Sequence, residues 1–144
     1  MAVFLGVFGA AALVMGCGGG GDDALTKAEF TKQANGICKE LLSDAEAEMS
    51  AWSKSKEKNA EGEQVNAQGE TVSEIMGGYY TTKAERLGEL NPPEAEQDQF
   101  DEMLAALDRA IEEGEETPER FVSGSKSLEE VGAASTELGL ECNS

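Results

Sequence analysis

The chain has 144 residues, 29 of them acidic and 11 basic, and its formal net charge at pH 7 is −18. This charge excludes nucleic acid as a partner, because phosphates would be repelled, and it favours a partner that is basic or a cation. The sequence has no histidine. Its absence excludes the Ser-His-Asp and Cys-His arrangements of nucleophilic catalysis.

An apolar run covers residues 3–15 and is followed closely by Cys17. The run is too short to span a membrane, which takes about 20 apolar residues, and it is typical of a signal peptide. The order Leu13-Val14-Met15-Gly16-Cys17 resembles a bacterial lipobox, in which the cysteine is acylated and becomes the mature N-terminus. We therefore predict a cleaved lipoprotein signal peptide at residues 1–16 and lipidation of Cys17.

The start of the predicted signal peptide is atypical. Residues 1–4 carry no Lys or Arg, although a signal peptide normally begins with positive charge. Either the true start codon lies upstream or the signal is atypical. The alternatives are a buried N-terminal hydrophobic helix and a secreted protein without lipid. The four glycines after Cys17 predict a flexible tether at residues 17–24 with a reach of about 15 Å. A helical domain is predicted to follow at residues 25–144.

The first helix is predicted over residues 26–58. Thr26 followed three residues later by Glu29 forms a capping box. Apolar residues then recur at steps of three and four along one helical face. They are Phe30, Ala34, Ile37, Leu41, Ala45, Met49 and Trp52. Residues 59–70 are polar and glycine-containing, and they predict a loop with room for some helix.

The second helix begins at another capping box, Thr71 with Glu74, and ends before Asn91-Pro92-Pro93, since a residue before proline avoids the helical region. Gly77-Gly78 interrupts it at a cost of about 1 kcal/mol per glycine. Its apolar face comprises Val72, Ile75, Met76, Tyr79, Tyr80, Leu87 and Leu90.

The third helix is predicted from about residue 94, and it frays at 112–116, where clustered negative charge opposes the negative helix end. Its apolar stripe comprises Phe100, Met103, Leu104, Leu107 and Ile111. Thr117-Pro118 is expected to start a short helix through Phe121-Val122, which ends at Gly124.

The last helix is predicted from a third capping box, Ser127 with Glu130. Gly139 is its expected C-cap glycine, after which Leu140 folds back onto the last turn. The sequence has no strand candidate, because no period-two run is sustained. Four amphipathic helices with short connections predict an all-α, up-down-up-down bundle.

With Cys17 lipidated, Cys38 and Cys142 remain, an even number in an oxidising compartment. We predict that they form a disulfide, which closes a loop of about 105 residues and is worth roughly 4.7 kcal/mol in the chain-entropy model. The bundle topology returns the chain end to the N-terminal side of the first helix, where Cys38 lies. Two distant cysteines do not make a metal site, and their separation differs from that of redox motifs.

Three short motifs resemble a family of small actinobacterial envelope lipoproteins and secreted proteins. They are Thr26-Lys27-Ala28-Glu29-Phe30 continued by Ala34-Asn35-Gly36-Ile37-Cys38, then Leu87-Gly88-Glu89-Leu90-Asn91-Pro92-Pro93, and Leu138-Gly139-Leu140-Glu141-Cys142. The resemblance spans residues 26–142. It implies a helical fold, the pairing of the two cysteines and an envelope location, and it carries no catalytic residue.

The acidic clusters are interpreted as solvated surface. A glycosidase needs two carboxylates that face each other across a cleft, so a carboxylate-dependent hydrolase is a minor hypothesis. A weak cation site at 112–116 is an alternative, although the stretch lacks the ligand pattern of a calcium loop.

Three aromatic residues are candidate ligand contacts. Tyr79 and Tyr80 follow Gly77-Gly78, and glycines can admit a ligand while tyrosines offer a flat face and a hydroxyl. Trp52 precedes lysines at 54, 56 and 58, which could together meet a polyanion or lipid headgroups. In each case the alternative is structural: close helix packing for the tyrosines and a core position for the tryptophan.

These observations predict a lipid-anchored protein on the extracytoplasmic face of the cell membrane, without catalysis, cofactor or metal. Its expected function is a binding or scaffold module of the envelope that meets a protein partner. The alternative is a carrier or sensor of small molecules or lipids, with an apolar pocket between helices near the two tyrosines.

Overall fold

The computed structural model describes residues 24–142 and contains five helices in that range. They are α1 (Lys27–Lys54), α2 (Val72–Gly88), α3 (Gln97–Glu116), α4 (Arg120–Ser123) and α5 (Lys126–Glu137). No strand occurs between residues 24 and 142, so the prediction of an all-α domain is confirmed. The predicted signal peptide, Cys17 and most of the tether lie outside the described residues.

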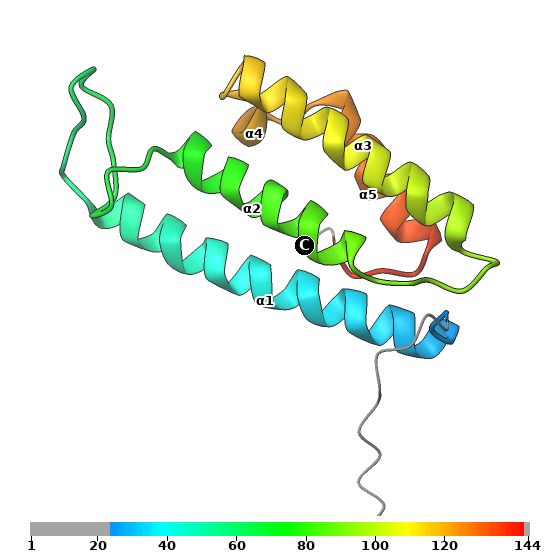
Figure 1. The fold of residues 1–144 in the computed structure, drawn as a ribbon. Coiled ribbons are helices and arrows are strands. Elements are labelled where there is room, and N and C mark those ends of the chain that lie inside the picture. The colour runs from blue at the N-terminus through cyan, green and yellow to red at the C-terminus, as the bar shows by residue number, and fades with distance from the viewer. Residues whose placement is uncertain (1–23, 143–144) are drawn as a thin grey trace, which may run out of the picture.

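The four longer helices alternate in direction, as the up-down-up-down topology predicts (Figure 1). α1 packs on α2, α2 on α3, and α3 on α5, while the short α4 packs against α2 and α3. Along the described chain, α1 and α5 do not approach each other closely. The bundle therefore has an open side between its first and last helices.

Both predicted capping boxes of the first two helices are present. Thr26 and Glu29 exchange hydrogen bonds at the start of α1, and Thr71 and Glu74 do so at the start of α2. These hydrogen bonds lower the pKa of the Glu29 and Glu74 carboxyls, because they stabilise the ionised form. Both helix starts are therefore fixed by the local sequence.

α1 ends at Lys54, earlier than the predicted 58. The Trp52 indole Nε1 donates to the Gln64 carbonyl at 3.0 Å, and the Gln64 side-chain amide donates to the Trp52 carbonyl at 2.6 Å. These two bonds fold the following loop back onto the helix end. Asn66 is buried within that loop and accepts two backbone N–H groups, so the segment is an ordered turn rather than additional helix.

The predicted junctions around α4 are wrong in two places. Thr117 is the C-cap of α3 rather than the N-cap of α4, and α3 stays helical through Glu116 instead of fraying. Ser125, not Ser127, caps α5, and its hydroxyl accepts the Leu128 N–H. The Ser127 hydroxyl donates to Glu113 at 2.8 Å. This contact and the Arg120 guanidinium beside Glu113 offset some of the negative charge that we expected to end the helix.

The core is centred on Phe30 of α1 and Phe100 of α3, whose rings meet edge to face with centroids 5.1 Å apart. Cys38 is buried, whereas the neighbouring Ile37, which we had placed on the apolar face, is only partly buried. The pattern of apolar residues predicted which side of α1 faces the core. It did not predict the rotation of the helix about its axis closely enough to distinguish Ile37 from Cys38.

The C-terminal segment is attached to α1 and α5 at several points. Gly139 has the positive φ of 72° expected of a C-cap glycine, and the Leu140 N–H bonds to the Ser135 carbonyl, as predicted. The Glu141 N–H donates to the Asn35 side chain at 2.8 Å. Cys142 then forms the predicted disulfide with Cys38.

Phe121 lies between two glycines on different helices. A Cβ atom built on Gly114 would lie 2.2 Å from the Phe121 ring, and one on Gly77 would lie 3.0 Å from it. Close packing against Phe121 thus explains the glycine at position 77. Gly78 has no such neighbour within 4 Å.

We expect Gly114→Ala to destabilise the protein by about 1–3 kcal/mol, because the added methyl group displaces the Phe121 ring. Gly78→Ala is the matched control, and it should stabilise α2 by up to about 1 kcal/mol through helix propensity. Urea unfolding followed by circular dichroism measures both. Equal effects of the two substitutions would contradict the packing explanation.

Candidate functional site

The open side of the bundle forms a groove with a volume of about 540 Å³. α5 contributes five of the lining residues and α2 contributes four, while α1 and the C-terminal segment contribute one each. Pockets for small molecules typically have volumes of about 300–1,000 Å³. We call this the α1/α5 groove. Its lining residues are Leu42, Met76, Tyr79, Tyr80, Lys83, Leu128, Val131, Gly132, Ala133, Thr136 and Cys142.

The α2 side of the groove carries Met76, Tyr79, Tyr80 and Lys83. Their spacing of three, four and seven residues places them on one helical face. The tyrosine rings lie 5.0 Å apart, and the Tyr80 ring stacks on Phe121 with centroids 6.0 Å apart. Burial raises the pKa of both tyrosines, so their hydroxyls stay neutral at physiological pH.

Among residues 24–142, Lys83 is the one charged residue that lines this groove, and the residue is 3% exposed. Its Nζ donates to the Cys142 carbonyl at 2.9 Å and lies 5.5 Å from the centre of the Tyr79 ring. Desolvation by burial lowers the Lys83 pKa from 10.5 to about 8. The ammonium is therefore still mostly charged at pH 7.

Sequence reasoning missed Lys83, although a signal was available. The residue lies between Tyr80 and Leu87 on the apolar face of α2, where the helical period calls for a hydrophobic side chain. A lone charge at such a position marks either a buried ion pair or a polar contact within the core. The structure supplies a backbone carbonyl from a residue 59 positions away, and no local pattern predicts that partner.

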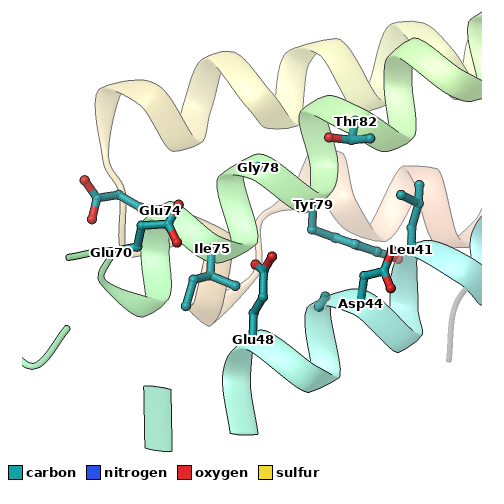
Figure 2. Close-up of a pocket in the computed structure, with 10 residues that line it drawn as sticks. Leu41, Asp44, Glu48, Glu70, Glu74, Ile75, Gly78, Tyr79 and Thr82 are labelled. Atoms are coloured by element: carbon teal, nitrogen blue, oxygen red, sulfur yellow. The ribbon is translucent and has the colours of Figure 1, made fainter. Parts of the chain in front are cut away.

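A second, smaller cleft of about 280 Å³ lies between α1 and α2 (Figure 2). Tyr79 extends from α2 toward α1 there, and Glu48 projects from α1 toward α2. Of the nearby carboxylates, Glu74 is bound to Thr71 and Glu70 is bound to Asn66. The lowered pKa of Glu74 keeps it ionised, which is the opposite of what a general acid in a hydrolase requires.

The structure brings two of the three predicted contact residues together and leaves the third apart. Tyr79 and Tyr80 both line the α1/α5 groove, whereas Trp52 lies at the end of α1 and is bound to the 55–71 loop. Trp52 is half-buried rather than a core residue. Its hydrogen bond with the loop gives it a structural role. Among residues 24–142, no cluster of His, Cys, Asp and Glu side chains could hold a metal ion.

Comparisons with models of protein families, with curated proteins and with solved structures found no significant match to this chain. Within the part of the chain that the structure describes, no helix combines the length and apolar character needed to cross a membrane.

The Lys83 pKa predicts a specific dependence of stability on pH. Between about pH 8 and about pH 10 the unfolded chain retains a proton that folded Lys83 has released, so the free energy of unfolding rises with pH. From about pH 7 to about pH 9.5 the gain is on the order of 2 kcal/mol relative to Lys83→Met, which has no such proton. Subtracting the variant's unfolding free energy from that of the wild type removes all shared titrations. A difference that stays constant over this range would contradict the burial of a charged ammonium.

Proposed function

We propose that this protein is a membrane-tethered carrier or sensor that binds a small apolar molecule in the α1/α5 groove on the extracytoplasmic side of the cell membrane. The proposal rests on the groove itself. Five large apolar or aromatic side chains there stay half-buried, because no helix of the described chain packs over this side of the bundle. They are Leu42, Met76, Tyr79, Tyr80 and Leu128. A ligand seated there would complete their burial, at about 25 cal/mol per Å² of apolar surface removed from water.

The location rests on the N-terminal sequence. The lipobox-like order ending in Cys17 and the glycines after it support an acyl anchor with a short tether. The resemblance to actinobacterial envelope lipoproteins supports the same location. The disulfide is also consistent with it, since such bonds persist in oxidising compartments.

A scaffold that binds a protein partner is the second candidate, and the cleft between α1 and α2 favours it. Asp44 and Glu48 are exposed on one face of α1 beside that cleft, and the whole chain is acidic. A basic segment of an envelope protein would complement these charges. The two candidates differ in the surface used, so they can be tested separately.

We expect the full chain to bind the neutral fluorescent probe N-phenyl-naphthylamine and Ala133→Trp to weaken that binding by about tenfold, because the indole occupies the α1/α5 groove. Ala133 is exposed, so the substitution leaves the core intact. Ala105→Trp, on an exposed position of α3 away from the groove, is the control. Absence of probe binding by the wild type, together with a reproducible crosslinked protein partner, would favour the scaffold instead.

We expect Cys17→Ser to release the protein from the membrane fraction, because the acylated thiol is the proposed anchor. A non-lipidated chain carrying a net charge of −18 has little affinity for an anionic bilayer. Cell fractionation with immunodetection measures the effect, and Ser43→Ala, on the exposed face of α1, is the control. A Cys17→Ser protein that still sediments with membranes would overturn the anchor.

A further inference from the structure

Lys83 differs from the other paired cations of the described chain in its partner. Five ion pairs join Lys or Arg to Glu at or near the surface, and Lys83 is in none of them. Acidic residues outnumber basic ones by 29 to 11, so the shortage is not one of carboxylates. The most buried lysine of the described residues is held instead by a neutral carbonyl.

Among residues 24–142, this arrangement gives the ammonium one hydrogen bond and no carboxylate partner. An ammonium has three N–H donors, and the contact with the Cys142 carbonyl uses one of them. The Tyr79 ring at 5.5 Å offsets a further part of the desolvation through a cation–π contact. A buried charge without an ionic partner is costly, so an added anion at this place would be strongly stabilised.

The ammonium also lies next to the groove. Lys83 lines it, and its Nζ is hydrogen-bonded at 2.9 Å to the carbonyl of Cys142 and lies 5.5 Å from the centre of the Tyr79 ring, both of which are lining residues too. α1 contributes Leu42, and α5 contributes no ionisable side chain to the lining. One positive charge therefore lies at one place along a predominantly apolar surface.

We propose that the α1/α5 groove binds a single-chain amphiphile with a carboxylate headgroup, which pairs with Lys83 while the chain covers Leu42, Met76 and Tyr80. This assignment rests on the proposed carrier function and adds the class of ligand. A phosphate monoester carries close to two negative charges at pH 7. One ammonium would balance only half of that charge in a protein of net charge −18, whereas a carboxylate matches it.

The test is displacement of N-phenyl-naphthylamine from the full chain by dodecanoate, dodecanol and dodecyl phosphate, with the alcohol kept below its solubility limit and the two anions below their micelle concentrations. Lys83→Met should lower the affinity for dodecanoate about tenfold or more, because it removes a charged hydrogen bond. The affinity for dodecanol should not change. Lys83→Gln retains a donor for the Cys142 carbonyl and should behave in the same way if Lys83→Met folds poorly. Lys32→Met, on an exposed position of α1, is the control.

A pH series provides a second readout. The affinity for dodecanoate should fall as Lys83 loses its proton above its pKa of about 8, whereas the affinity for dodecanol should not change. Among the described residues, the other titratable groups that line the groove are Tyr79 and Tyr80, whose raised pKa values keep their hydroxyls neutral as Lys83 titrates. α1 and α5 contribute no titratable lining residue.

The outcomes separate this inference from the function on which it rests. If the neutral probe fails to bind, the carrier function is wrong. If the probe binds but dodecanoate is equally effective on wild type and Lys83→Met, the carrier function stands and the carboxylate assignment is overturned. Tighter, Lys83-dependent displacement by dodecyl phosphate would also overturn the carboxylate in favour of a phosphate headgroup.

Discussion

The disulfide between Cys38 and Cys142 is the constraint on which the rest of the arrangement depends. It joins residues 104 positions apart with a Cα–Cα distance of 5.1 Å. In the chain-entropy model a loop of this length is worth about 4–5 kcal/mol, a large part of the stability of an ordinary domain. Because α1 and α5 do not pack on each other, this bond is the covalent link that holds the last segment against the first helix. The disulfide joins α1 to the segment that follows α5, so these two helices stay in place although they do not pack on each other.

The bond also has a local consequence. It brings the Cys142 carbonyl to α2, where that oxygen accepts the Lys83 ammonium. Without this oxygen the ammonium would be buried with no hydrogen-bond acceptor among the described residues, and burial of that kind costs several kcal/mol. The Asn35 side chain adds a further fixed point by accepting the Glu141 N–H. The short motifs around Cys38 and Cys142 therefore meet in space, and Asn35 has a structural role that its place in the sequence did not reveal.

The sequence predicted the elements that depend on local rules. Capping boxes located the starts of α1 and α2, the helical period gave their inward faces, and Gly139 gave the turn that ends α5. Predictions failed where a distant residue decides the outcome. Gln64 ends α1 by binding Trp52, and Glu113 draws Ser127 away from the cap that Ser125 then provides. Of the site, Tyr79 and Tyr80 line the groove and their role as ligand contacts stays a prediction, whereas Lys83 was not predicted, because its partner is set by the tertiary fold.

The acidic surface and the groove act on an approaching anion over different distances. Screening limits the repulsion between a distant anion and the acidic surface to about 8 Å at physiological ionic strength. A small carboxylate approaching from solution gains little, because Lys83 is only 3% exposed and the described residues that line the groove include no second cation. The apolar chain of the proposed amphiphile would change this balance, since its burial on Leu42, Met76 and Tyr80 would add free energy to the pairing of its headgroup with the ammonium. An acidic surface combined with one buried cation thus disfavours small anions, and it would favour anions that carry an apolar body, as the proposed ligand does.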